Sequence, residues 1–305
     1  MGLVSASGKI IHSLCYPTDA GNGPEAVQGQ LADGVRKLTS QGDAVSIMGI
    51  GIGVAGQVDA DNRKVLFAPN LPAWHEIPLG EKLEKETGVP VHVINDVRAI
   101  TLGEWTYGAG SGYQNLVCII IGTGIGGGVV SNGNLLTGCS NAFGEIGHMT
   151  IDFRGPLCTC GNRGCLEVYA GGWGIARQAK ESIGFYGEAG KFLLEEANGE
   201  KEAITARTVV SAYRKNDKLA QIMIERVKTA LTAGCSNLIN AFNPCCLILG
   251  GGIVDGLPEL IPWIKMGVKE IALKASTRNL KIIEAKLGKE GGVIGAAAFA
   301  MQKLI

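Results

Sequence analysis

Three cysteines and a histidine in the middle of the chain have the types and spacing of a metal-binding group. Cys158, Cys160 and Cys165 lie among glycines, and His148 precedes them. Thiolate sulfur and imidazole nitrogen are the usual ligands of closed tetrahedral zinc sites. Free thiols at this density have little packing reason to occur, so the pattern favours zinc over unliganded loop cysteines. Because four protein ligands leave no open coordination position, the predicted zinc ion is structural.

Two glutamates flank this metal motif. Glu145 stands three residues before His148, and Glu167 stands two residues after Cys165. If a metal ion fixes His148 and Cys165, it also brings the two carboxylates near each other, where they can accept hydrogen bonds from several hydroxyl groups. Taken singly, each glutamate fits a solvated surface residue better. Anchored around one metal loop, the pair favours a ligand site.

Two glycine-rich segments follow apolar runs. Gly122-Thr123-Gly124 opens the first, which continues to Gly128, and Gly250-Gly251-Gly252 forms the second. Backbone N–H groups of such turns can approach an anion because no Cβ atom intervenes, so one interpretation is a nucleotide held between them. The other is a glycine-rich hairpin that only needs positive φ angles. Neither segment matches a Walker A loop or a dinucleotide-binding fingerprint.

The pair Asn95-Asp96 ends an apolar run and begins a helical pattern. An aspartate at such a position can be the N-cap of the helix. It can equally be a general base, because α/β folds place catalytic carboxylates at the carboxyl ends of strands. The sequence leaves these two roles open.

Short apolar runs alternate with helical patterns along the chain, which predicts an α/β fold with much parallel pairing. The expected strands are Ile47–Val54, Val89–Ile94, Leu116–Ile121 and Leu247–Leu249. The expected helices include one that carries Val27, Leu31, Val35 and Leu38, and a long one from Asp217 to Phe242. We also expect a C-terminal helix from Gly291 that returns to the first part of the fold.

Composition and charge narrow the classes of function. A chain of 305 residues with 46% hydrophobic and 18% charged side chains is globular, and this length favours two lobes. The 28 basic residues balance the 28 acidic ones without any basic block, so we expect no nucleic-acid or membrane partner. Neither a membrane span nor a secretion signal is evident, which predicts a cytoplasmic protein with small neutral substrates.

Together these motifs resemble the ROK family of sugar kinases and sugar-responsive repressors, within the actin, Hsp70 and hexokinase superfamily. Residues 121–148 resemble the family signature, and residues 158–167 resemble its zinc loop. Residues 54–59 and 69–74 resemble segments of the family's bacterial glucokinases. The resemblance implies a two-lobed, ribonuclease H-like α/β fold with a cleft between the lobes. It implies a small lobe of residues 1–98 and 288–305, and a large lobe of residues 99–287 that carries the zinc loop.

The resemblance also implies an activity, which is ATP-dependent phosphorylation of a hexose, with glucose favoured, at the 6-hydroxyl. Asp96 would be the general base, and Mg²⁺ would accompany ATP. The implied sugar contacts are Asn95, Asp96, Glu145, His148 and Glu167, with Gly56 and Asn70 as further contacts. The implied zinc ligands are His148, Cys158, Cys160 and Cys165. The phosphate loop would be Gly122, Thr123 and Gly124, and the adenosine loop Gly250, Gly251 and Gly252. A homodimer or homotetramer is implied as well.

One motif of the family's kinases is not found in the 305 residues. Those kinases begin with an apolar strand that ends in Asp-x-Gly-Gly-Thr, a first phosphate loop, whereas Met1 to Ile10 resemble the strand that follows it. We therefore expect the small lobe to lack its first strand. A non-catalytic sugar-binding protein is the alternative function. We do not expect a repressor, which would need a helix-turn-helix ahead of this body.

Overall fold

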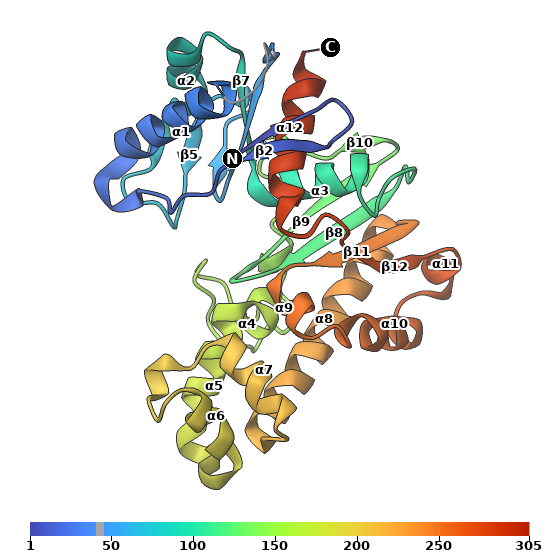
Figure 1. Cartoon of the computed structure of the whole chain (residues 1–305). Coiled ribbons are helices and arrows are strands. Elements are labelled where there is room, and N and C mark those ends of the chain that lie inside the picture. The colour runs from blue at the N-terminus through green and yellow to red at the C-terminus, as the bar shows by residue number, and fades with distance from the viewer. Residues whose placement is uncertain (41–45, 305) are drawn as a thin grey trace. The chain divides into compact units, whose positions relative to one another are not determined.

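The computed structural model describes residues 1–40 and 46–304, which fall into two compact units (Figure 1). Unit 1 comprises Met1–Tyr113, Leu135–Gly144 and Lys286–Ile305, and unit 2 comprises Gln114–Asn134 and Glu145–Ala285. The expected lobes differ from these units, since residues 99–113 and 135–144 belong to unit 1.

Unit 2 is built on a mixed five-stranded sheet. Its strand order is β10 (Asn134–Leu135), β9 (Ile125–Ser131), β8 (Leu116–Ile121), β11 (Cys246–Gly250) and β12 (Lys281–Glu284). β8 and β9 form an antiparallel hairpin, whereas β11 runs parallel to both β8 and β12. The predicted strands at 116–121 and 247–249 are confirmed. Both are almost wholly buried, which explains their continuous apolar sequence.

The predicted long helix is α8 (Lys218–Phe242), and it organises the helical part of unit 2. The Asp217 carboxylate caps its start by accepting from Ala220 N at 2.9 Å. Asn243 ends it in the left-handed conformation, with φ 44°. α8 packs against α4 (Leu166–Ala170), α5 (Gly172–Tyr186), α7 (Ala206–Arg214) and α10 (Leu260–Ile271). The remaining helices of this unit are α6 (Lys191–Glu196), α9 (Gly252–Gly256) and α11 (Lys274–Thr277).

The described part of unit 1 contains three small sheets. β1 (Gly2–Val4) pairs antiparallel with β2 (Ile10–Ser13), and β3 (Ile50–Val54) pairs parallel with β7 (Val91–Asn95). The third sheet holds β4 (Gln57–Val58), β5 (Val65–Phe67) and β6 (His75–Ile77). The strands predicted at 47–54 and 89–94 are therefore neighbours. Their inner faces join a core that also buries Trp74 and Leu79.

The α-helices of unit 1, within residues 1–40 and 46–304, are α1 (Gly23–Ser40), α2 (Leu79–Thr87), α3 (Asp96–Tyr107) and α12 (Gly291–Lys303). α12 returns from the C-terminus to lie along α3 and β3, as predicted (Figure 1). These elements touch through their backbones. A Cβ atom at Gly295 would lie 1.7 Å from the Ala99 carbonyl oxygen, and one at Gly51 would lie 1.8 Å from the Ala296 carbonyl oxygen.

A cavity of about 700 Å³ lies within unit 1. Residues 1–6, residues 46–53 and several residues of α12 line it, and so does Asp96. Within the described residues, β1 pairs only with β2, and β3 pairs only with β7. β1 and β3, which both border the cavity, therefore belong to separate sheets.

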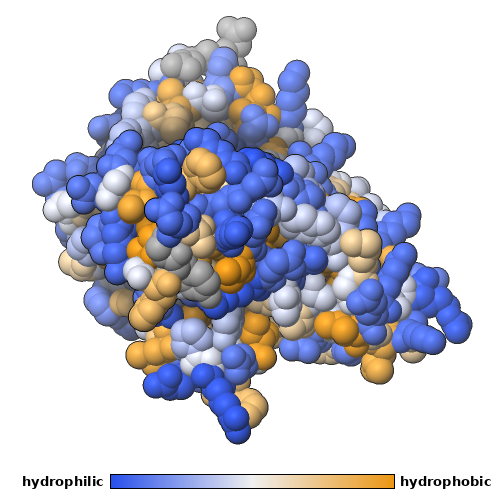
Figure 2. Space-filling model, turned by 90° about the horizontal axis from the view of Figure 1, so that it is seen from below, coloured by the Kyte–Doolittle hydropathy of each residue, from blue (hydrophilic) through white to orange (hydrophobic). Residues whose placement is uncertain are grey.

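Among the helices of the described chain, none has the length and apolarity that a membrane crossing requires. On the face shown in Figure 2, hydrophobic side chains form small areas separated by hydrophilic ones. Scattered apolar side chains of this kind are normal on protein surfaces.

The close approach of α12 to α3 generates a prediction about stability. Gly295→Ala should lower the free energy of unfolding by about 1–3 kcal/mol, because the new methyl group must displace the backbone of α3. Gly292→Ala in the same helix is the matched control, since its Cβ atom would meet only Ile100 at 3.8 Å. The control should be neutral or gain up to about 1 kcal/mol from helix propensity. Urea denaturation measures both, and equal stability of the two variants would contradict the packing assignment.

Candidate functional site

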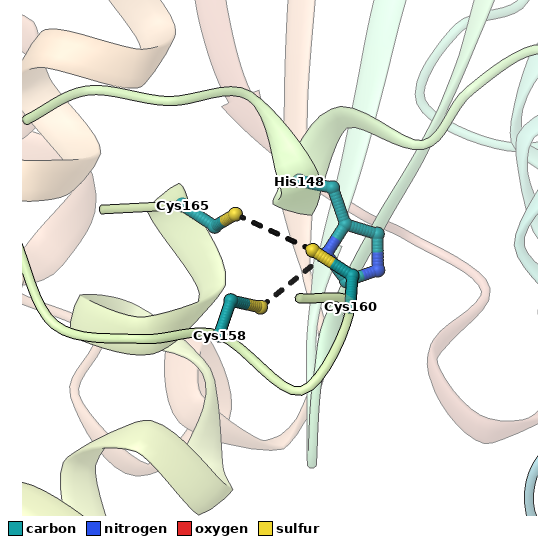
Figure 3. A group of neighbouring side chains, drawn as sticks. All are labelled: His148, Cys158, Cys160 and Cys165. Atoms are coloured by element: carbon teal, nitrogen blue, oxygen red, sulfur yellow. Dashed lines mark hydrogen bonds between the residues drawn. The ribbon is translucent and has the colours of Figure 1, made fainter. Parts of the chain in front are cut away.

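The four predicted metal ligands come together in unit 2 (Figure 3). Their ligand atoms all lie within 4.8 Å of one another. The Cys160 and Cys165 sulfurs are 3.7 Å apart, and the Cys158 sulfur is 3.7 Å from His148 Nδ1. In a tetrahedral site with zinc–sulfur bonds of about 2.3 Å, neighbouring ligand atoms lie about 3.8 Å apart. The donor set and its spacing therefore fit a tetrahedral zinc ion.

Three segments present these ligands. His148 ends the short 3-10 helix η2 (Ile146–His148), and Cys165 directly precedes α4. Between them the loop turns tightly at Gly164, where φ is 63° and a Cβ atom would lie 1.6 Å from the Asp152 carbonyl oxygen. Burial raises the pKa of the Cys165 thiol to about 12. A metal cation bound to the sulfur would lower the pKa again, because it stabilises the deprotonated thiolate.

Glu145 and Glu167 flank the metal loop in different environments. Glu145 is exposed, and its carbonyl accepts from His148 N at 3.1 Å. Glu167 is only 9% exposed and lies in the first turn of α4. One Glu167 carboxylate oxygen accepts from Ile125 N at 2.7 Å, and the other accepts from Trp173 Nε1 at 2.8 Å. The surface interpretation therefore does not apply to Glu167.

The first glycine turn joins β8 to β9 and is held by the start of α5. Gly172 N donates to the Gly122 carbonyl at 2.9 Å, and Trp173 N donates to the Thr123 carbonyl at 3.0 Å. No glycine from 122 to 128 has a positive φ, so the hairpin does not use them for that reason. A Cβ atom at Gly124 would instead lie 2.3 Å from a Glu167 oxygen, whereas one at Gly122 would meet nothing within 4 Å.

The second glycine turn joins β11 to α9 at the same edge of the sheet. Gly250 is the register partner of Ile120 in the parallel pair of β11 and β8. Gly251 has φ 97°, and a Cβ atom there would lie 2.6 Å from the Ile121 carbonyl oxygen. The two turns thus meet at the carboxyl ends of neighbouring parallel strands, where open α/β sheets bind ligands.

In unit 1, the structure separates the two roles that the sequence left open for Asn95-Asp96. Asn95 is the N-cap of α3, since its Oδ1 accepts from Val97 N and Arg98 N, both at 3.1 Å. Asp96 is the first helical residue, and its carboxylate accepts from Val97 N at 2.9 Å. Burial raises the pKa of the Asp96 carboxyl, although the Val97 hydrogen bond opposes the shift. A raised pKa suits a general base.

The two further predicted contacts also lie in unit 1. The Gly56 carbonyl accepts from Asn95 Nδ2 at 3.2 Å. A Cβ atom at Gly56 would lie 2.4 Å from the Phe67 carbonyl oxygen, so packing alone requires glycine here. Asn70 is exposed in the turn between β5 and β6. Of the candidates, Gly56, Asn70, Asn95 and Asp96 belong to unit 1, and all others belong to unit 2.

Trp173 is a site residue that sequence reasoning missed. Its indole N–H binds Glu167, and its ring packs against the buried cluster of Cys158, Cys165 and Val168. The Arg177 guanidinium lies 4.9 Å from the centre of the ring. A lone tryptophan at the start of a helix carries no pattern that distinguishes this role from ordinary packing.

Comparison with known proteins agrees with the motifs. The ROK family model matches residues 1–303. A glucokinase of Thermotoga maritima is 34% identical over 304 residues, which cover 100% of this chain and 94% of that protein. The crystal structure of a ROK family glucokinase from Streptomyces griseus in complex with glucose and AMPPNP has a TM-score of 0.83 and 32% identity, covering 99% of this chain and 95% of that one.

A xylose repressor of Bacillus subtilis is 29% identical over 286 residues, covering 93% of this chain and 69% of that protein. The same fold thus occurs in relatives with a regulatory name and in relatives with a kinase name. The predicted actin- and hexokinase-like α/β fold class is confirmed by the structural neighbours. The motifs, the fold and these comparisons agree, and the chain belongs to the ROK family.

Proposed function

We propose that this protein is a sugar kinase that transfers the γ-phosphoryl group of ATP to the 6-hydroxyl of glucose. The observation that carries the proposal is the state of Asp96. Asn95 caps α3, so the cap does not depend on the half-buried Asp96 carboxylate, and partial burial raises the pKa of that carboxyl. Kinase-named relatives along the whole chain support the same activity.

In this mechanism the Asp96 carboxylate accepts the proton of the 6-hydroxyl group. The resulting oxygen forms a bond to the γ-phosphorus of ATP, and the bond to the β-γ bridging oxygen breaks to release ADP. Mg²⁺, when bound with ATP, would neutralise charge on the phosphate oxygens. The turn Gly122-Thr123-Gly124 would bind the phosphates, and Gly250-Gly251-Gly252 would lie beside the adenosine.

The remaining sugar hydroxyls would contact Asn95, Glu145, His148 and Glu167, with Gly56 and Asn70 nearby. His148 can serve both the metal and the sugar. Its Nδ1 atom faces the Cys158 sulfur. Metal ligation through Nδ1 would leave Nε2–H to donate a hydrogen bond to a hydroxyl group.

We propose further that His148, Cys158, Cys160 and Cys165 hold one structural zinc ion. Zinc would fix the loop from which α4 and Glu167 follow. The number, chemistry and spacing of the four residues support this assignment. Because four protein ligands complete a tetrahedral site, no position on the metal would remain for a substrate.

A second candidate is a non-catalytic sugar-binding protein. The 305 residues contain no Asp-x-Gly-Gly-Thr loop, and the cavity of unit 1 lies between β1 and β3 with Asp96 in its wall. Packed interiors rarely contain voids of this size. A further strand placed there would pair with β1 and β3, fill the cavity and carry a phosphate loop toward Asp96.

The base assignment predicts a separation of catalysis from binding. Asp96→Asn should lower kcat with glucose by at least about 10²-fold, because the amide cannot accept the proton. Glucose affinity measured by calorimetry should fall no more than about tenfold, the size of one hydrogen bond. The exposed Asp61→Asn is the matched control and should keep full turnover. Lost glucose binding in a folded Asp96→Asn variant would contradict the assignment.

The same base gives turnover a pH dependence. Asp96 must be deprotonated to act, so kcat/KM should fall as the pH is lowered through its pKa. Burial places that pKa above the ordinary aspartate value, so the acid limb should lie above pH about 4. An acid limb at or below that pH, or one that persists unchanged in Asp96→Asn, would show that a group other than Asp96 is the general base.

An added strand separates the kinase proposal from the second candidate, because only the kinase proposal predicts a gain in turnover. A version preceded by an apolar strand and an Asp-x-Gly-Gly-Thr loop should show higher glucose-dependent ATP consumption than the 305-residue chain in a coupled assay. The added loop would supply a wall for the γ-phosphate. If the extended version folds and binds glucose but shows no turnover, the kinase proposal fails and the binding protein remains.

The metal proposal predicts about one equivalent of zinc by elemental analysis. Cys160→Ser should lower metal affinity at least about tenfold, as measured by chelator competition. Cys139→Ser changes another exposed cysteine and serves as the control, which should retain zinc. Less than about half an equivalent in the unaltered protein would count against the site.

A further inference from the structure

Each carboxylate oxygen of Glu167 accepts one hydrogen bond, and the two donors belong to different elements. Ile125 N belongs to the first residue of β9, directly after the glycine turn, and it donates at 2.7 Å. Trp173 Nε1 belongs to α5 and donates at 2.8 Å. Since the side chain is 9% exposed, these hydrogen bonds replace most of its contact with water. The orientation of the carboxylate therefore depends on both donors.

The glycine turn is fastened to the same group of residues. Gly172 N and Trp173 N hold the carbonyls of Gly122 and Thr123 at 2.9 and 3.0 Å. Gly124 lies so close to Glu167 that a Cβ atom there would come within 2.3 Å of its oxygen. The turn cannot move far from Glu167 without breaking these contacts.

Trp173 is held rigidly in turn. Its ring packs on Cys158, Cys165 and Val168, and the Arg177 guanidinium covers it at 4.9 Å from the ring centre. Arg177 also donates to the Leu157 carbonyl at 2.8 Å, which attaches it to the metal loop. The indole N–H therefore has a fixed position, and its hydrogen bond to Glu167 orients the carboxylate.

A negative charge beside a phosphate-binding turn needs an explanation. Glu167 repels an incoming phosphate and also occupies the Ile125 N–H, which would otherwise be available to an anion. A hydroxyl group that donates to Glu167 would spread its charge and weaken its hold on Ile125 N.

On the basis of the proposed function, we propose that Trp173 is a positioning residue that couples sugar binding to nucleotide binding through Glu167. Sugar at Glu167 makes the turn Gly122-Thr123-Gly124 a better site for phosphate. By linkage, nucleotide in the turn strengthens sugar binding by the same factor. The sign of the coupling is positive.

Calorimetry on the full chain tests the coupling without relying on turnover. The Kd for glucose is measured alone and with saturating AMPPNP and Mg²⁺. In the unaltered protein, AMPPNP should strengthen glucose binding at least about fivefold. In Trp173→Phe the ring contacts remain but the N–H is lost, so the factor should fall below about twofold. The variant should retain zinc.

Trp263→Phe is the matched control. Trp263 is a partly buried tryptophan of α10, and a cation, Lys228, likewise lies 5.3 Å from its ring centre. This variant should keep the coupling of the unaltered protein. Glu167→Gln is a second test if Trp173→Phe folds poorly, because it removes the charge with little change in shape. It should weaken glucose binding and abolish the coupling.

The outcomes are distinct. Coupling that persists in Trp173→Phe, or glucose and AMPPNP affinities that fall equally with an unchanged coupling factor, would overturn the proposal. An unaltered protein that binds both ligands independently would overturn it too, while the proposed function stands. An unaltered protein that binds neither ligand would instead overturn the proposed function and this inference together.

Discussion

The position of Glu167 is the constraint on which the rest of unit 2 depends. Cys165 is the residue directly before α4, so whatever fixes the metal loop also fixes Glu167, which follows two residues later in the first turn of α4. Glu167 then holds the backbone of Ile125 and leaves no space for a side chain at Gly124. One chain of contacts thus runs from the metal loop to the glycine turn. In this account a zinc ion would take no part in the reaction but would fix the positions of His148 and Glu167.

In unit 1, the corresponding constraint lies at the start of α3, where Asn95 is the N-cap and Asp96 is the first helical residue. Asn95 satisfies the backbone N–H groups of Val97 and Arg98, which every helix start leaves without partners. The helix itself is fixed by glycine contacts with α12 at Gly103 and Gly295. Asp96 is therefore held by rigid elements, while its carboxylate is buried enough to raise its pKa. A rigid, poorly solvated carboxylate is suited to proton transfer.

The elements, and the four side chains that group together in the metal loop, could be predicted from the sequence because their signals are local. Leu116–Ile121 is recognisable by its apolar run, and Cys158, Cys160 and Cys165 by their spacing. Sequence reasoning attributed the glycines of the first turn either to anion approach or to positive φ, and missed the contact between Gly124 and Glu167, which are 43 positions apart. Contacts between distant segments leave no local pattern.

Contacts between distant segments also explain why the sequence did not predict the unit to which residues 135–144 belong or the role of Trp173. The assignment of residues 135–144 to unit 1 accompanies a hydrogen bond from Arg98 to Asn141, whose side chain also binds the Asp59 carbonyl at 2.6 Å. The sequence of residues 135–144 contains no pattern that predicts these hydrogen-bond partners. Trp173 likewise gains its role from Glu167 and from the metal loop. Such positions follow from the fold and cannot be read from any short stretch of sequence.

The most direct measurement of the central claim is ³¹P NMR of the protein with ATP, Mg²⁺ and ¹³C-labelled glucose. The account predicts that ADP and a phosphomonoester appear in equal amounts, with the phosphorus coupled to carbon 6 of the sugar. Formation of ADP with inorganic phosphate alone, or of a phosphate ester at another carbon, would contradict it.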